Sequence, residues 1–438
     1  MKRIKNILIT NAIALNGGDA AILHATIEIL KAQFGDDITI TVHDMAAKAS
    51  SRYYPAITFR SDIYSEAVAW ARGRVRPAIA AIAVLAVAGL MRIAPGNRLT
   101  ARLSPSLCAT LDDYLKADVV VSSGGTYLVP HYALASKLLD FLTAHFLGKP
   151  LVLFTQSLGP FRAIEHRALL RYVLRRAALI LVRDERSRSY LGDLGVPPAR
   201  VQLCADAVFS LARHDLPRGR FPPPHQNWRI AISVRDWPHF QGGAQNGMER
   251  YYTSLVALVC ELTERWRAEV TFISTCQGTP EYWTDDSRIA EKIVERLPQA
   301  LRDRVTIDRN FRNPDQLIAD LATYDLTIAT RLHAAILSLC AGTPVLPISY
   351  EFKTTELFRR FGLGGATIDV EGISPHAILA AFDAASAFWS AQSEEAWSKV
   401  AAAQRSAFDA GKFVARALEG KVSEPLPRAR GNVFQGRD

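Results

Sequence analysis

The feature that most constrains the fold is a regular alternation of short apolar runs with longer helical stretches, which occurs twice along the chain. The first series of apolar runs covers residues 4–10, 38–43, 119–122, 151–156 and 179–182. Helical patterns at 20–34 and 165–177 lie between these runs. Strands that alternate with helices in this way form a parallel sheet covered by helices on both faces.

A second series of the same kind follows a proline-rich break at residues 213–228, which contain four prolines and mixed charge. Its apolar runs cover residues 230–234, 270–275, 305–308, 326–330 and 345–349. We therefore predict an α/β fold with two doubly wound, Rossmann-like domains that face each other across a cleft. The expected boundaries are 1–212 for the N-terminal domain, 213–228 for a linker, 229–385 for the C-terminal domain, 386–418 for a helical segment and 419–438 for a disordered tail.

Composition narrows the range of partners. The 438 residues carry a net charge of +9, which favours anionic partners. No dense basic block or nucleic-acid motif occurs, so we expect no nucleic-acid partner. The five cysteines are widely spaced and form no metal-binding pattern, which is typical of reduced thiols in a cytoplasmic protein. We expect no metal and no cofactor.

The segment 72–102 is expected to be an insertion in the first domain. Residues 78–91 are fourteen uncharged, mostly apolar residues with several arginines on either side. This is shorter than the roughly 20 residues that span a bilayer. Two alternatives remain: a helix packed on its own domain, or a peripheral helix that contacts the inner face of the cytoplasmic membrane.

Two glycine-containing loops follow predicted strands. Gly17 and Gly18 precede Asp19 between the first strand and the first helix, where backbone N–H groups attract anions. Asp19 could cap that helix or contact a substrate. Gly124 and Gly125 follow the strand DVVVSS, either as a second ligand loop or as a tight strand-to-helix turn.

Polar and charged residues end further strands. Gln156 closes the run LVLFTQ, and Arg183 follows LILV within the charged sequence RDERS. Arg183 could belong to a solvated charge cluster, but Asp184 would more readily lead a helix and leave Arg183 in the cleft. Asp206 and Arg235 lie in or end apolar runs, as structural ions or as cleft residues.

Arg331 and His333 stand where an apolar strand turns into a small-residue helix. A permanent guanidinium charge can fork onto a phosphate or carboxylate, and an imidazole can exchange a proton near neutral pH. An isolated Arg-x-His of this kind can equally be a surface arginine and a histidine at the helix start. The other strand-end residues favour a site.

The order of these motifs resembles the polysaccharide pyruvyl transferase family. They are NGGD, DVVVSSGG, FTQSLGP, LVRDERS, CADAVF and TRLH followed by AGTP, across roughly residues 5–360. The resemblance implies a two-domain fold like that of GT-B glycosyltransferases. It also implies transfer of pyruvate from phosphoenolpyruvate to a sugar of a surface polysaccharide, or to its lipid-linked precursor, as a cyclic ketal. By this resemblance Arg183 and Arg331 would bind the donor and His333 would be catalytic. We expect Arg235 to bind the donor as well, because it ends an apolar run in the same way.

Two other functions compete with this one. A GT-B glycosyltransferase or epimerase would use a sugar nucleotide, but the glutamate that often holds the ribose in such enzymes is replaced here by Leu337. A non-catalytic, membrane-associated assembly factor would keep the fold without the chemistry. Asp19 and Asp206 are candidates for the base that an acceptor hydroxyl needs.

Overall fold

The chain forms two compact units, each built on a parallel sheet. Among the described residues, the first unit comprises those within 3–14, 22–207 and 406–420, and the second comprises those within 15–21 and 208–405. The computed structural model describes residues 3–71, 76–93, 103–130, 132–161, 166–219, 227–276 and 279–420.

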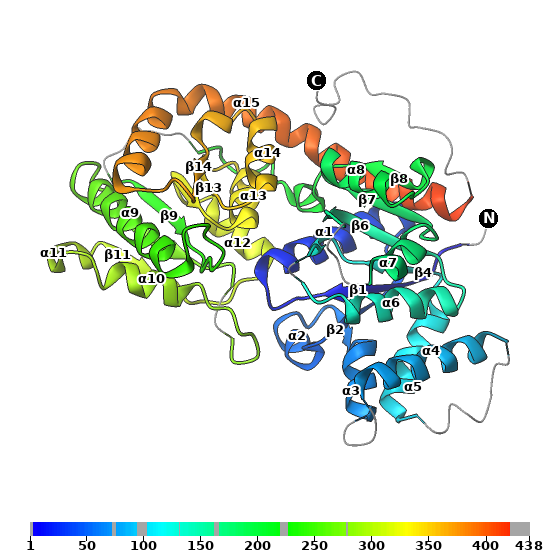
Figure 1. Cartoon of the computed structure of the whole chain (residues 1–438). Coiled ribbons are helices and arrows are strands. Elements are labelled where there is room, and N and C mark those ends of the chain that lie inside the picture. The colour runs from blue at the N-terminus through cyan, green and yellow to red at the C-terminus, as the bar shows by residue number, and fades with distance from the viewer. Residues whose placement is uncertain are drawn as a thin grey trace. The chain divides into compact units, whose positions relative to one another are not determined.

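The first unit contains an eight-stranded sheet in which every pair of neighbours is parallel (Figure 1). The strand order is β3-β2-β1-β4-β6-β7-β8, with β5 beside β6, so the order reverses between β1 and β4. All eight residues of β6 are buried, as expected for a strand covered on both faces. The strands are β1 (Asn6–Ala12), β2 (Thr39–Asp44), β3 (Thr58–Arg60), β4 (Val119–Ser122), β5 (Gly125–Leu128), β6 (Leu151–Leu158), β7 (Leu179–Val182) and β8 (Val201–Leu203).

Helices cover this sheet, and α3, α4 and α5 form a group at one end of the unit (Figure 1). Local chemistry sets their starts: Asp184 caps α8 by accepting a hydrogen bond from the Ser187 amide at 2.7 Å. The helices are α1 (Gly17–Phe34), α2 (Ala47–Tyr53), α3 (Ile63–Ala71), α4 (Pro77–Ile93), α5 (Pro105–Lys116), α6 (Ala135–Phe146), α7 (Arg167–Leu174) and α8 (Glu185–Asp193).

The second unit contains a six-stranded parallel sheet in the order β11-β10-β9-β12-β13-β14. Its order reverses between β9 and β12, because the chain adds strands first on one side of β9 and then on the other. The strands are β9 (Arg229–Ser233), β10 (Glu269–Ile273), β11 (Val305–Ile307), β12 (Leu326–Ala329), β13 (Val345–Ser349) and β14 (Ile368–Asp369). The prediction of two parallel α/β sheets covered by helices is confirmed.

The helices of the second unit include α13, whose interior positions are small or aliphatic and buried. Gly342 ends α13 in the left-handed conformation, with φ of 78°, which glycine adopts without strain. The helices are α9 (Ala244–Glu264), α10 (Ser287–Val294), α11 (Gln299–Arg302), α12 (Pro314–Leu321), α13 (Leu332–Ala341), α14 (Phe352–Arg360) and α15 (Pro375–Leu418), whose residues from 406 onward belong to the first unit.

Two expected segments look different in the structure, and a third lies outside the described residues. Within the expected linker 213–228, the Arg213 amide donates to the Cys340 carbonyl at 2.9 Å and the Gly219 amide to the Gly342 carbonyl at 2.8 Å, so this stretch is fastened to the end of α13. Residues 220–226 lie outside the described part. Helix α15 runs unbroken through the expected boundary at 385/386. The expected disordered tail lies outside the described residues from 421 onward.

Candidate functional site

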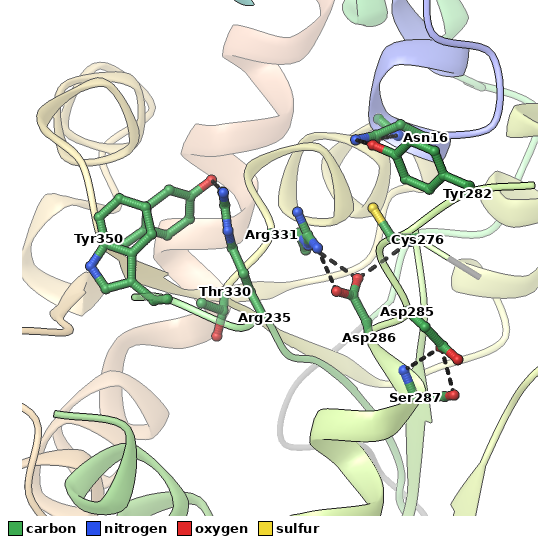
Figure 2. Close-up of polar contacts among 12 residues, drawn as sticks. Asn16, Arg235, Cys276, Tyr282, Asp285, Asp286, Ser287, Thr330, Arg331 and Tyr350 are labelled. Atoms are coloured by element: carbon green, nitrogen blue, oxygen red, sulfur yellow. Dashed lines mark hydrogen bonds and ion pairs between the residues drawn. The ribbon is translucent and has the colours of Figure 1, made fainter. Parts of the chain in front are cut away.

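The reversal of strand order in the second unit is where its polar residues gather. In an open parallel sheet, ligands bind at the carboxyl ends of the strands where the order reverses. Arg235 follows β9 and Arg331 follows β12, on the two sides of this point. Figure 2 shows Arg331 between Arg235 and Tyr350 on one side and Cys276 with the Asn16–Tyr282 pair on the other.

Arg331 is held by a buried carboxylate. Its Nε donates to Oδ2 of Asp286 at 3.0 Å and its Nη2 donates to Oδ1, which makes a two-pronged ion pair (Figure 2). The Asp286 side chain is 1% exposed and that of Arg331 is 13% exposed. Burial raises the pKa of Asp286, while Arg331 acts in the opposite direction. The pair uses the Nε–Nη2 edge of the guanidinium.

Arg235 lies against aromatic rings. Its Nη1 donates to the hydroxyl of Tyr350, and its guanidinium carbon is 4.4 Å from the Tyr350 ring centre and 5.2 Å from that of Trp237. The charge of Arg235 also lowers the pKa of Asp286, in the same sense as Arg331. Both arginines therefore act on one carboxylate. That Arg235 is a cleft residue and not a structural ion stays a prediction.

His333 is the second residue of α13 and packs on the first turn of α1. A Cβ atom placed on Gly18 would lie 2.6 Å from Nδ1 of His333, so only glycine allows this approach. A Cβ atom on Gly17 would lie 2.4 Å from the carbonyl oxygen of Thr275, and the Gly17 amide donates to that oxygen at 2.7 Å. The glycines thus bring the N-terminus of α1 against the N-terminus of α13.

Asn16 caps α1, which corrects one alternative for Asp19. The Asn16 carboxamide oxygen accepts from the amides of Gly18 at 3.0 Å and Asp19 at 3.4 Å, and its Nδ2 donates to the Tyr282 hydroxyl at 3.1 Å. Helix α1 begins at Gly17, so the expected loop glycines belong to its first turn. Asp19 stands in that turn, near enough to raise the pKa of Cys276 and Tyr282.

Cys276 carries a thiol in this site. Burial raises its pKa to about 12, although the charge of Arg331 acts against that rise. The thiol is therefore protonated at neutral pH and is a poor nucleophile there.

In the first unit, Arg183 and Asp206 form a buried ion pair. Arg183 donates from Nη1 to Oδ2 of Asp206 and from Nη2 to Oγ1 of Thr126 at 3.0 Å. The alternative of a solvated charge cluster is wrong for Arg183. The expected helix start at Asp184 and Glu185 is confirmed.

The other predicted residues of the first unit lie on or next to strands β5 and β6. They are Gly124, Gly125 and Gln156. The glycines lead into strand β5, so the expected strand-to-helix turn is wrong. Gly124 has no room for a side chain, since a Cβ atom would lie 2.6 Å from Oγ1 of Thr155. Gln156 is fully buried, and its Nε2 donates to the Ser123 carbonyl at 2.6 Å and to the Tyr127 hydroxyl at 2.9 Å.

The sequence-predicted residues therefore fall into two sets. Arg235, Arg331 and His333 gather with Gly17 and Gly18 in the second unit. A second set, Gly124, Gly125, Gln156, Arg183 and Asp206, lies in the first unit. That the two sets share one cleft stays a prediction, as do the roles assigned to each residue.

Sequence reasoning missed Asp286, Tyr350, Asn16 and Tyr282. Asp286 precedes a helical pattern and looks like an ordinary helix-start carboxylate, 45 residues from its arginine. Asn16 offered the one sequence signal among these four, because asparagine is a common helix-capping residue and here precedes two glycines. In the described ranges, no group of three or more His, Cys, Asp or Glu side chains is arranged to hold a metal ion.

Comparison with known proteins gives a family and a fold. Residues 16–351 match the family described as polysaccharide pyruvyl transferase. The amylovoran biosynthesis protein AmsJ of Erwinia amylovora is 26% identical over 395 residues, which are 86% of this chain and 91% of that protein.

Similar solved structures have GT-B-type folds. MnaA of S. aureus with UDP has a TM-score of 0.59 at 10% identity and covers 97% of this chain and 99% of its own. Anabaena HepE with UDP-glucose has a TM-score of 0.56 at 13% identity, over 95% and 99% of the two chains. The UDP-GlcNAc 2-epimerase of Neisseria meningitidis has a TM-score of 0.54 at 12% identity, over 95% and 100%. At these identities the likeness shows the fold alone.

Proposed function

Because the chain belongs to the polysaccharide pyruvyl transferase family, we propose that it moves the pyruvyl group of phosphoenolpyruvate onto a sugar. The acceptor would be a bacterial surface polysaccharide or its lipid-linked precursor, and the product a cyclic ketal with release of phosphate. The similarity to an amylovoran biosynthesis protein supports a role in polysaccharide biosynthesis. The observation that supports the proposal is that Arg235, Arg331 and His333 follow β9 and β12, the two strands between which the strand order of the second unit reverses.

The donor carries a carboxylate and a phosphate, and the site offers matching cations. Arg331 is oriented by Asp286, while Arg235 is steadied by Tyr350. The N-terminus of α13 adds backbone N–H groups that favour negative charge. The amides in the first turn of α1 already donate to Asn16 and Thr275. Arg183 is proposed as a further donor contact from the first unit.

The chemistry requires a proton at the donor's methylene carbon. His333 as general acid would deliver it and leave a cationic centre at C2, which one sugar hydroxyl attacks. Loss of phosphate and attack by a neighbouring hydroxyl then close the ketal. Of the two hydroxyl protons, one replaces the proton given by His333 and the other leaves with phosphate. General acid catalysis of this kind contributes roughly 100-fold or more.

The acceptor hydroxyl needs a base, and the structure favours one of the two candidates. Asp206 is buried against Arg183, where its charge is already compensated. Asp19 lies in the first turn of α1, in the same unit as His333. We therefore propose Asp19 as the base.

The function is tested on the glycan itself. Surface polysaccharide from a deletion strain should lack the mass of one pyruvyl ketal per repeat, and the wild-type gene should restore it. A gene carrying His333→Ala should not. Unchanged pyruvylation in the deletion strain would contradict the proposal.

The main alternative is a glycosyltransferase or epimerase that uses a sugar nucleotide. The structures of MnaA and HepE, which share the fold at 10% and 13% identity, hold UDP or UDP-glucose, which is the reason to test this alternative. Leu337 argues against it, because it is fully buried in α13 at the place of the ribose-binding glutamate. Thermal unfolding with each ligand separates the two, since a ligand stabilises the state that binds it. Stabilisation by UDP and not by phosphoenolpyruvate would favour the sugar nucleotide.

The third alternative is a non-catalytic, membrane-associated assembly factor. It predicts no phosphate release from phosphoenolpyruvate with any lipid-linked or nucleotide-linked sugar. Release that depends on His333 would exclude it.

A further inference from the structure

Exposed apolar side chains concentrate on three helices of the first unit, namely α4, α6 and α7. Ile82 is 66% exposed and Ile93 is 82% exposed. Helix α6 packs against both α4 and α7. Six of the nine exposed large hydrophobic side chains in the described ranges lie on these helices: Ile79, Ile82, Ile93, Phe146, Leu169 and Tyr172.

Helix α4 has two apolar faces. Ala80, Val84 and Ala88 recur every four residues and are buried, so this face packs on the unit. Ile79 and Ile82 lie on the opposite, solvent-exposed face. A helix packed on its own domain and a helix at the membrane surface were the two alternatives for this segment. They are compatible, because the helix packs on its own domain and still presents an apolar face outward. Among the described residues, no helix is long and apolar enough to cross a bilayer.

The exposed side chains form one surface. Position 89 of α4 lies beside Phe146, since a Cβ atom placed on Gly89 would be 3.4 Å from the Phe146 ring. The ring of His145 lies next to that of Phe146, with centres 6.2 Å apart. His145 Nε2 and the Tyr172 hydroxyl are 2.9 Å apart. The surface therefore continues from α4 across the end of α6 to α7.

The charges around this surface are positive. Arg92 lies at the end of α4, and Arg176 lies 3.8 Å from the Tyr172 ring centre. Both arginines act to lower the pKa of His145, which places their charges beside it. The sequences of the three helices contain one acidic residue, Asp140, which is buried.

We propose that this surface docks onto an anionic lipid bilayer. Its apolar and aromatic side chains would enter the boundary between headgroups and acyl chains, where Tyr and Phe are well accommodated. Arg92 and Arg176 would contact headgroup phosphates. A second copy of the same chain fits less well, because it would bring like charges together at the apolar contact.

The proposal is tested by flotation of the full chain with vesicles. Wild type should float with vesicles that contain phosphatidylglycerol and much less with pure phosphatidylcholine. Ile82→Asp should weaken binding by roughly tenfold or more, because it replaces an exposed isoleucine that docking would bury. Met45→Asp is the matched control, because Met45 is an exposed hydrophobic of the first unit outside the docking surface.

The electrostatic part is tested separately. Arg92→Glu and Arg176→Glu should each weaken binding to the anionic vesicles by roughly fivefold or more, since one basic residue near the surface contributes about 1 kcal/mol. Far-UV circular dichroism and melting temperature would verify folding of each variant.

Three outcomes would overturn the proposal: no flotation of wild type with anionic vesicles, unchanged flotation of Ile82→Asp, or equal loss in Met45→Asp. A wild-type dimer that Ile82→Asp dissociates would instead assign the surface to contact between copies. None of these results depends on phosphoenolpyruvate, so they leave the proposed transfer activity untouched.

Discussion

At the scale of single residues, the site depends on a carboxylate that does not itself need to touch substrate. Asp286 is buried and would be costly to ionise without a cation, and Arg331 supplies that cation through two hydrogen bonds. The pair fixes the direction of the guanidinium. If Arg331 binds the donor as proposed, Asp286 is a positioning residue for that arginine.

Replacing Asp286 with Asn tests this positioning. The asparagine amide keeps one oxygen that can accept a hydrogen bond from Arg331, but it loses the negative charge and the second hydrogen bond. The guanidinium of Arg331 should therefore become less ordered. We expect the KM for phosphoenolpyruvate to rise roughly tenfold with a smaller change in kcat, and the fold to lose on the order of 2–4 kcal/mol. Steady-state kinetics and denaturant melts measure both. An unchanged KM in a destabilised variant would restrict Asp286 to a structural role.

His333 is tested by removal of its ring. His333→Ala should lower turnover by roughly 100-fold or more, because no other group would protonate the methylene carbon. The melting temperature should change little, since the side chain is partly exposed at a helix start. Phosphate release at saturating donor is the measurement. Near-normal turnover would remove His333 from the mechanism.

At the scale of elements, the first turn of α1 packs against the imidazole ring of His333 and sets the position of that ring. Gly17 faces the backbone of Thr275 and Gly18 faces the His333 side chain, so a methyl group at each position meets a different obstacle. A backbone carbonyl cannot move without its strand end, whereas a side chain can rotate.

Alanine substitutions separate these two contacts. Gly18→Ala should displace the His333 ring and lower kcat roughly tenfold or more, because small misplacements of a catalytic group are costly. Stability should hold, since alanine favours helix by about 1 kcal/mol over glycine. Gly17→Ala should lower the melting temperature instead. If both variants kept wild-type kcat and stability, the close packing of α1 would be unimportant.

The free energy of unfolding is expected to depend on pH through a buried carboxyl group of α6. Asp140 of α6 accepts a hydrogen bond from the Tyr114 hydroxyl, and burial together with the charge of Asp62 raises its pKa to about 7. The unfolded chain releases this proton near pH 3.9. Between these values the folded state holds a proton that the unfolded state has lost, so the free energy of unfolding falls as pH rises.

Asp140→Asn should remove that slope. At pH 8 the variant should be more stable than wild type by roughly 2–4 kcal/mol, and near pH 4 the difference should shrink. Chemical denaturation across this range measures it. A wild-type stability that is flat from pH 4 to 8 would contradict the raised pKa.

At the scale of the whole molecule, residues of the two units are predicted to hold one donor. If one phosphoenolpyruvate molecule contacts both Arg183 and Arg331, it should slow hydrogen exchange at the starts of α8 and α13 together. Arg331→Ala should abolish both effects, because the donor would no longer be held. Hydrogen-exchange mass spectrometry makes the comparison. Protection confined to α13 would exclude Arg183 from the donor site.

Much of this architecture was predictable because strand and helix periods are local. Apolar runs such as 326–330 and the capping pattern at Asp184 were sufficient to place elements. Pairings across long sequence distances were not: nothing in the sequence joins Asp286 to Arg331 or Tyr350 to Arg235. The pattern NGGD looks like a loop, so the start of α1 was missed by three residues, because glycine disfavours helices in general yet is needed here for close packing.

The membership of residues 15–21 in the second unit has a consequence for modular exchange between relatives. Consider a chimera that takes residues 208–405 from one parent and the residues before 208 from another. Its Asn16–Gly18 turn and its His333 would then come from different proteins. Chimeras should therefore be viable when the cap and both glycines travel with the C-terminal half. A chimera joined only at residue 207/208 would therefore divide one folding unit between two parents.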